Sequence, residues 1–312
     1  MKLAHVSLSG VRGVTVELPL AGKPCVCLTG PVGSGKTTVL EAIAGAKEVA
    51  GCAGVPPRRS CFAPRGGNGS VTLQWELDAD HAKTLEVGTV ETRWDLSGEV
   101  QKQAPSPLVD RLRSYRLDPL SWKAEYFHVG RVADAAPMDF DPGAGPRLTK
   151  APHKYAWLRS FLEKAAAREG ARTVATLREE GIALSSTTPN ELSGFGRNVA
   201  ALSTHLRWLG TEAGADGFSC LFARRRGGST AELAELTDSE RMVVVFAATI
   251  EALGLYKSLV LVDLPELAIH PEDQAGFFEG LAGLLHEGQL IAATTSPAIL
   301  RSLPRERVVV LG

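Results

Sequence analysis

A glycine-rich segment at residues 26–38, with the sequence VCLTGPVGSGKTT, constrains the fold more than any other part of the chain. It fits the phosphate-loop pattern G-x-x-x-x-G-K-[ST] at every position. An apolar run precedes the pattern and residues 38–43 continue as a helix, which is the structural context that this pattern requires. The sequence therefore predicts a strand, a phosphate-binding loop and a helix, in that order.

The residue types of this loop suit a phosphate ligand. Its glycines allow the backbone to curl so that successive N–H groups converge on phosphate oxygens, and the helix that follows adds its positive N-terminal end. In this pattern the lysine, here Lys36, reaches the β- and γ-phosphates of a nucleotide, and the hydroxyl of Thr37 holds Mg²⁺. The predicted nucleotide-binding residues of the loop are Gly30, Gly33, Ser34, Gly35, Lys36, Thr37 and Thr38.

The composition bounds the size of the protein and its partners. The chain has 312 residues, 44% of them hydrophobic, which is enough for a substantial core in one large α/β domain or two smaller ones. Its 34 Lys and Arg balance 35 Asp and Glu at a net charge of −1, so contact with nucleic acid would need a local basic patch. The arginines of 58–65 and of 224–226 are the candidates for such a patch, although the sequence favours solvent-exposed loops at both segments.

The cysteines and the apolar runs indicate a compartment. The five cysteines are an odd number without metal-type spacing, which favours a reducing environment. The first residues lack the apolar run of a signal peptide, and no apolar run approaches the length needed to span a bilayer. We therefore expect a cytoplasmic protein without a membrane part.

Hydrophobic periodicity predicts a small β lobe early in the chain. Residues 70–77 alternate between apolar and polar side chains, and 84–95 have the pattern of their antiparallel neighbour, so the two segments together form a lobe beside the nucleotide. The other elements predicted in residues 1–230 are strands at 2–8, 14–20, 122–129 and 218–223, a helix from the loop to residue 46, and helices at 153–180 and 198–209.

The final third of the chain alternates helices and strands. Residues 240–253 are almost wholly apolar, which predicts a buried helix, and 258–262 form the continuous apolar run of a central parallel strand. The remaining predicted elements are a helix at 271–287 with Pro271 in its first turn, a strand at 289–295, a short helix at 297–303 and a closing strand at 307–311.

Strands that alternate with helices behind a phosphate loop predict an α/β P-loop NTPase fold. Its sheet is mainly parallel and flanked by helices, with a small antiparallel β lobe and a helical insertion. We expect a single ATPase head over residues 1–312. Its parts are an N-terminal part at 1–133, a helical insertion at 134–230 after a Pro/Gly-rich link, and a C-terminal part at 231–312.

Asp263 ends the apolar run 258–262 and is the natural second anchor for Mg²⁺ beside Thr37. With it, the chain resembles the ATPase head of the ABC superfamily, in its RecF/SMC/OLD-like branch. Four ordered segments carry the resemblance. Residues 9–13 resemble the N-terminal arginine turn, 236–241 (LTDSER) the signature L-S-x-G-E-[RQ], 263–271 (DLPELAIHP) the segment D-E-P-E-x-x-L-H-P, and 294–297 (TTSP) the segment T-H-S-P.

The resemblance implies roles for residues outside the loop. Arg12 would lie near the nucleotide, and Thr295 would stand at the position of the γ-phosphate sensor. Thr237 and Ser239 would begin a helix that points at the γ-phosphate held by an opposite protomer. The implied cofactors are ATP and Mg²⁺, and the implied partner is a second copy or a related ATPase subunit.

The chain departs from this family where hydrolysis is performed. Leu264 stands where the family has the glutamate that polarises water, Thr295 where it has the switch histidine, and Ser239 where it has the signature glycine. The binding residues Lys36 and Asp263 are retained. A Q-loop glutamine is not placed, although residues 128–131 lie where one would sit. Losing a positioned base typically costs about 10²–10⁴ in rate.

Several functions remain open from the sequence. The resemblance favours an ATP-dependent switch with slow or absent hydrolysis that controls a separate effector, such as a nuclease, in DNA repair or anti-phage defence. A competent ATPase that uses Glu266 as the base is the alternative, and a structural acid is the other interpretation of Glu266. A transporter cassette is disfavoured because the signature is degenerate and residues 100–225 resemble no such cassette.

Overall fold

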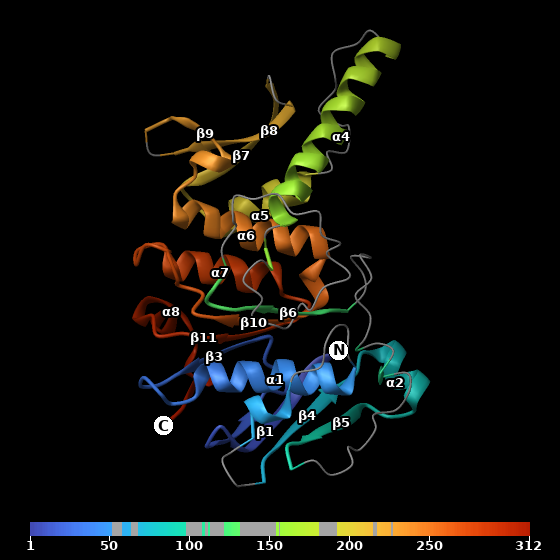
Figure 1. Ribbon diagram of the computed structural model, residues 1–312, viewed down its shortest axis with the longest axis vertical. Helices are drawn as coiled ribbons and strands as arrows, with labels where there is room; N and C mark the ends of the chain where they lie inside the picture. The colour runs from blue at the N-terminus through green and yellow to red at the C-terminus, as the bar shows by residue number, and fades with distance from the viewer. Residues whose placement is uncertain are drawn as a thin grey trace.

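The computed structural model describes residues 1–51, 58–63, 68–97, 108–109, 112, 122–131, 154–155, 157–180, 192–214, 217–225 and 227–312. Figure 1 shows a parallel sheet across the middle of the molecule, with helices above it and a helix and an antiparallel sheet below it. A long helix and a small sheet extend from the upper side. This arrangement confirms the predicted α/β P-loop NTPase fold with its antiparallel lobe.

The parallel sheet has the strand order β12-β3-β11-β10-β6. Its pairings are parallel because each strand returns to the same edge after a crossover. Residues of β10 and β11 are buried along their whole length, as their continuous apolar runs predict. The strands are β3 (Cys25–Thr29), β6 (Ala124–Phe127), β10 (Leu259–Asp263), β11 (Gln289–Ala293) and β12 (Val308–Val310).

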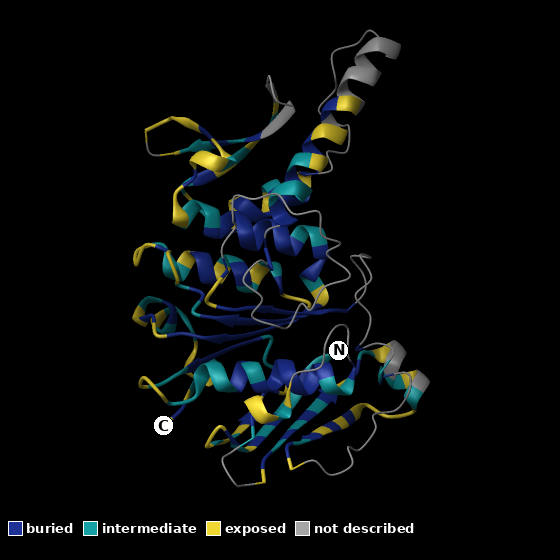
Figure 2. Cartoon of the chain, in the orientation of Figure 1, coloured by how far each residue is buried: buried dark blue, intermediate teal, exposed yellow. Residues whose placement is uncertain are grey.

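Helices cover both faces of this sheet. In Figure 1, α1 lies on one face, while α6 and α7 lie on the other, with α5 packed against both. Figure 2 shows that the buried residues follow the same layers, in one core above the sheet and another below it. The helices are α1 (Lys36–Ala50), α4 (Trp157–Glu180), α5 (Ser193–Leu202), α6 (Asp238–Leu253), α7 (Gln274–Leu284) and α8 (Pro297–Ser302).

Two antiparallel sheets complete the fold. The lower one has the order β2-β1-β4-β5 and packs on α1, and its strands alternate buried and exposed side chains as an open sheet does. Its elements are β1 (Lys2–Val11), β2 (Val14–Pro19), β4 (Ser70–Glu76), α2 (Ala79–Leu85) and β5 (Thr89–Asp95). The upper one is β7 (Leu206–Gly214), β8 (Gly217–Arg224) and β9 (Thr230–Glu232).

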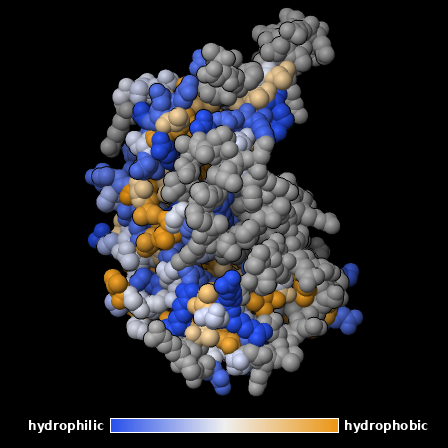
Figure 3. Space-filling view, in the orientation of Figure 1, coloured by the Kyte–Doolittle hydropathy of each residue, from blue (hydrophilic) through white to orange (hydrophobic). Residues whose placement is uncertain are grey.

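Short 3₁₀ turns join several of these elements. They are η1 (Arg59–Cys61), η2 (Leu233–Glu235), η3 (Leu255–Lys257) and η4 (Arg305–Arg307). Figure 3 shows hydrophilic side chains over much of the described part of one face, with hydrophobic ones gathered at the height of α7.

Three sequence-based boundaries are wrong. The predicted helix 198–209 ends at Leu202, where the Ser203 hydroxyl accepts the N–H groups of His205 and of Leu206, the first residue of β7, at 3.1 Å each. The predicted strand 84–95 begins only at Thr89, after α2 and a glycine. Pro271 precedes α7, whose first residue is Gln274, since a tight turn intervenes. The predicted link at 134–147 lies outside the described residues.

Candidate nucleotide-binding site

The candidate site lies where the carboxyl ends of neighbouring parallel strands meet. The phosphate loop follows β3, Thr294 and Thr295 follow β11, and Leu264 follows β10. In open α/β sheets, ligands bind outside the carboxyl ends of the strands. The fold thus brings together segments that are more than two hundred residues apart in the chain, as the hydrogen bonds between Thr37 and Asp263 demonstrate with a separation of 226 residues.

Glycine is required at two points of the loop. Gly30 has a φ of 142°, and a Cβ atom there would lie 2.1 Å from the carbonyl oxygen of Leu311. Gly35 has a φ of 89°, and a Cβ atom there would lie 2.5 Å from a methyl group of Val14. The loop therefore lies closely between Leu311, which follows the last strand, and Val14 of the β lobe. This close packing fixes its curled path before any ligand binds.

Lys36 lies within the concave side of this loop. Its ammonium donates hydrogen bonds to the carbonyl oxygens of Gly30 at 2.9 Å and Pro31 at 2.8 Å, and it lies 3.4 Å from the hydroxyl oxygen of Ser34. Thr38 follows in the first turn of α1. A positive charge and the N-terminal end of α1 therefore converge at one place, which suits the phosphates of a nucleotide.

Thr37 and Asp263 form the part of the site that fits a metal ion. The Thr37 hydroxyl oxygen lies 2.9 and 3.1 Å from the two carboxylate oxygens of Asp263, which is 2% exposed. Oxygen ligands of this kind suit Mg²⁺, which uses one or two protein carboxylates and completes its shell with water and phosphate oxygens. Within the described ranges, no group of three or more His, Cys, Asp or Glu side chains could hold a metal ion without such help.

The turn that follows β10 carries Leu264 and Glu266. Leu264 has a φ of 50°, an unusual value for a leucine, and its N–H donates to the carbonyl of Ala293 at 2.8 Å. The Glu266 carboxylate accepts hydrogen bonds from the Thr295 N–H at 2.8 Å, the Thr295 hydroxyl at 3.1 Å and the Thr294 hydroxyl at 2.8 Å. Glu266 therefore joins this turn to the segment after β11.

Arg12 contacts α1 and the segment around η1. It forms an ion pair with Glu41 and donates to the carbonyl of Cys61 at 2.7 Å, and its guanidinium lies 4.7 Å from the ring centre of Phe62. These contacts connect the turn between β1 and β2 to α1 and η1. The predicted approach of Arg12 to the nucleotide stays a prediction.

Thr237 and Ser239 stand at the start of α6, on the opposite face of the sheet from α1 (Figure 1). Thr237 caps this helix and shares a capping box with Glu240. Arg224 of β8 binds the same Glu240 carboxylate through both oxygens, at 2.7 and 3.0 Å. The structure thus groups the signature residues with the upper sheet, and it does not bring them to the phosphate loop of the same chain.

The electrostatics of Glu240 follow from this network. Burial by itself would raise the pKa of Glu240, but the hydrogen bonds from Arg224 and from Thr237 outweigh it and hold the pKa below its ordinary value of 4.5. Glu240 is therefore ionised at neutral pH and stabilises the first turn of α6.

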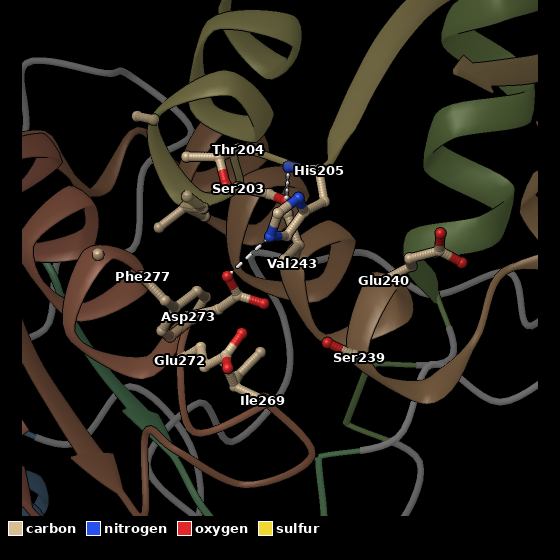
Figure 4. Close-up of a pocket in the computed structure, with 13 residues that line it drawn as sticks. Ser203, Thr204, His205, Ser239, Glu240, Val243, Ile269, Glu272, Asp273 and Phe277 are labelled. Atoms are coloured by element: carbon tan, nitrogen blue, oxygen red, sulfur yellow. Dashed lines mark hydrogen bonds and ion pairs between the residues drawn. The ribbon is translucent and has the colours of Figure 1, made fainter. Parts of the chain in front are cut away.

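A cavity of about 220 Å³ lies beside the signature residues. Figure 4 shows it between the start of α6, the turn before α7 and the segment that leads into β7, with the Glu240 carboxylate turned away from it. On one side of the cavity, the Nε2 atom of His205 lies 2.8 Å from the Oδ1 atom of Asp273. Sequence reasoning missed this cavity, because no spacing pattern links residues 203–205 to 269–277.

The two basic segments differ in their contacts. Arg58 lies directly before η1. Arg59 is the first residue of η1 and is partly buried. Arg224 is engaged with Glu240, so it is not a freely exposed cation. Arg65 and Arg226 lie outside the described residues. Contact with nucleic acid at these segments stays a prediction.

Among the helices of the described residues, none combines the length and the apolar character that crossing a bilayer requires.

Comparison with known proteins identifies the fold. The sequence matches no family model and no curated protein. The structure is similar to the Smc head bound to the C-winged helix domain of ScpA, with a TM-score of 0.60 and 12% identity over 99% of this chain and 96% of that one.

A second similar structure is the Smc head domain with an extended coiled coil bound to the C-terminal domain of ScpA, from Pyrococcus furiosus. Its TM-score is 0.57 and its identity 13%, over 99% of this chain and 93% of that one. The chain therefore has the fold of these Smc head domains, a P-loop NTPase fold.

Proposed function

We propose that this protein binds ATP and Mg²⁺ at the edge formed by β3, β11 and β10. The observation that carries the proposal is the contact of the Thr37 hydroxyl with both oxygens of the buried Asp263, beside a loop that holds the Lys36 ammonium. Lys36 and the N-terminus of α1 would bind the phosphates, and Thr37 and Asp263 would hold the metal ion.

The same arrangement supports a pairing of two heads. A site that uses Thr237 and Ser239 needs them from another chain, because α6 and α1 of one chain lie on opposite faces of the sheet. Apolar side chains also stand in solvent at this edge, with Val32 fully exposed at the tip of the loop and Leu267 38% exposed after β10. The second head is a copy of this chain or a related subunit.

We propose that this ATP-linked pairing is the output of the protein and that hydrolysis is slow or absent. Leu264 cannot accept a proton from water at the position directly after Asp263. The Glu266 carboxylate is engaged with Thr294 and Thr295, which supports a role in holding that segment rather than in activating water. The alternative, a competent ATPase that uses Glu266 as its base, requires this carboxylate to leave both threonines.

The switch would act on a separate effector in the cytoplasm. Both similar Smc heads are bound to a domain of ScpA, which supports the presence of a protein partner for a head of this fold. We propose an effector such as a nuclease, with a role in DNA repair or anti-phage defence. Purification of the tagged protein with a non-hydrolysable ATP analogue, and identification of what remains bound, would name it.

The pairing is tested by sedimentation of the chain with and without ATP and Mg²⁺. We expect a species of twice the mass only with nucleotide, and its loss in Ser239→Arg, which places a bulky cation at the start of α6. Ser302→Arg, at the end of α8, is the matched control and should pair normally. The pairing would be contradicted if the chain binds ATP but pairs neither with a second copy nor with a co-purifying subunit.

A further inference from the structure

Arg131 is a buried cation directly behind the candidate metal site. It follows β6 and is 1% exposed. One terminal nitrogen donates to the carbonyl oxygens of Asp263 at 2.6 Å and His128 at 3.1 Å, and the other donates to the carbonyl oxygen of Leu264. The guanidinium fork therefore binds two successive carbonyls of the turn that ends β10.

The rest of the guanidinium rests on α6. Its Nε lies 3.1 Å from the sulfur of Met242, and its central carbon lies 5.3 Å from the ring centre of Phe246. Arg131 thus packs against the helix that begins with the signature residues while it holds the turn after β10. These contacts leave the side chain little freedom to adopt another orientation.

The guanidinium of Arg131 suits this turn because of its geometry. It donates through a planar set of N–H groups, and carbonyl oxygens are the acceptors that the turn supplies.

The turn itself needs such support. Leu264 is in the left-handed conformation, which is unfavourable for a residue that is not glycine. Its N–H is bound to Ala293, so Arg131 and β11 hold the turn from its two sides. The carbonyl of Asp263 belongs to the same residue whose carboxylate contacts Thr37.

We infer that Arg131 is a positioning residue for the metal site, which aims the Asp263 carboxylate at Thr37 by binding the carbonyls of residues 263 and 264. The inference rests on the proposed function, since it assigns a residue to the Mg²⁺ of that site. Arg131 itself does not contact the metal. Its loss should weaken Mg²⁺ binding and leave the metal-free affinity for nucleotide intact.

Arg131→Lys is the sharpest test, because it keeps the charge and removes the planar fork. Because the positive charge is kept, a changed Mg²⁺ requirement cannot come from altered repulsion between residue 131 and the metal ion. Binding of a fluorescent ATP analogue is measured against Mg²⁺ concentration and again in EDTA. We expect the half-saturating Mg²⁺ concentration to rise about tenfold, as is typical when a residue that supports a metal ligand is changed, with less than a twofold change in EDTA.

Two further variants keep the test decisive if Arg131→Lys does not fold. Met242→Leu conserves volume and removes only the acceptor of Nε, and it should raise the Mg²⁺ requirement about twofold. Arg301→Lys, on an exposed face of α8, is the control and should change nothing. An unchanged Mg²⁺ requirement in every test variant that folds, Met242→Leu alone if Arg131→Lys does not, would overturn the inference, and so would an equal loss of affinity with and without Mg²⁺. A wild-type chain that binds no ATP would instead overturn the proposed function.

Discussion

The phosphate loop and the turn after β10 lie at the same edge of the sheet, yet only one of them retains its full set of functional side chains. The loop has Lys36 and Thr37 where the pattern requires them, and its path depends on glycine at 30 and 35. The turn has Leu264 directly after Asp263, and Thr295 nearby. We therefore expect that nucleotide binding and hydrolysis can be separated in this chain.

The difference follows from how each region is held. A Cβ atom at Gly30 or Gly35 would lie less than 3 Å from a neighbouring atom, so a side chain at either glycine would displace the loop. The turn is held through its main chain, because Arg131 donates to the carbonyl oxygens of residues 263 and 264 and the Leu264 N–H donates to the carbonyl of Ala293. The Glu266 side chain adds hydrogen bonds that it accepts from Thr294 and Thr295. None of these hydrogen bonds uses the side chain of residue 264, so a substitution there leaves them in place.

The largest expected effect is on the loop. Lys36→Ala removes the charge that the loop carries for the phosphates, and we expect at least a hundredfold loss of ATP affinity, or about 2.7 kcal/mol or more. Calorimetry measures it, with Lys257→Ala, in a surface ion pair with Glu287, as the control. Equal affinity in Lys36→Ala and wild type would show that the nucleotide site is elsewhere.

The second effect restores the missing base. Leu264→Glu places a carboxylate directly after Asp263, and a positioned general base is worth about 10²–10⁴ in rate. We expect a gain toward the lower end, because Thr295 and Ser239 also differ from the family pattern. Steady-state phosphate release measures the gain, and the double variant Leu264→Glu with Lys36→Ala should abolish it. No gain in a variant that still binds ATP would mean that residue 264 does not face the attacking water.

The third effect concerns the link between the turn and the segment after β11. Glu266→Gln keeps the shape of the side chain but removes its negative charge and replaces one carboxylate oxygen by an NH₂ group. The hydrogen bonds that the carboxylate accepts from Thr294 and Thr295 are thereby weakened. We expect the free energy of unfolding to fall by about 1–2 kcal/mol, with little change in hydrolysis. Urea denaturation and phosphate release are the two measurements. Stability equal to wild type together with lost hydrolysis would identify Glu266 as the base.

The smallest expected effect is on stability at the signature segment, and it is measured as a function of pH. The pKa of Glu240 is lower in the folded chain than its ordinary value of 4.5, so its contribution to stability is fully present above pH 4.5 and disappears as the pH falls through the lower, folded value. Glu240→Gln should therefore be slightly less stable than wild type at pH 7, and the difference should shrink below pH 4.5. A difference that stays constant from pH 7 to 3.5 would contradict this.

The sequence predicts the two regions unequally well. The loop, the central strands and Asp263 follow from local patterns, because glycine spacing and apolar runs report directly on a curled backbone and a buried strand. The role of Arg131 and the engagement of Glu266 with Thr295 do not, since each depends on contacts between segments that only the folded sheet brings together. The upper antiparallel sheet was missed in part, because Ser203 ends α5 where the helical pattern continues.

The most direct test of the account measures binding and turnover on the same preparation of the wild-type chain. Calorimetry with ATP and Mg²⁺ is followed by steady-state phosphate release at saturating ATP. We expect clear ATP·Mg²⁺ binding that Lys36→Ala abolishes, with turnover that is slow in the wild type and faster in Leu264→Glu. Wild-type turnover at a rate ordinary for ABC-type ATPases, which Glu266→Gln removes, would contradict it and establish a working ATPase with a relocated base.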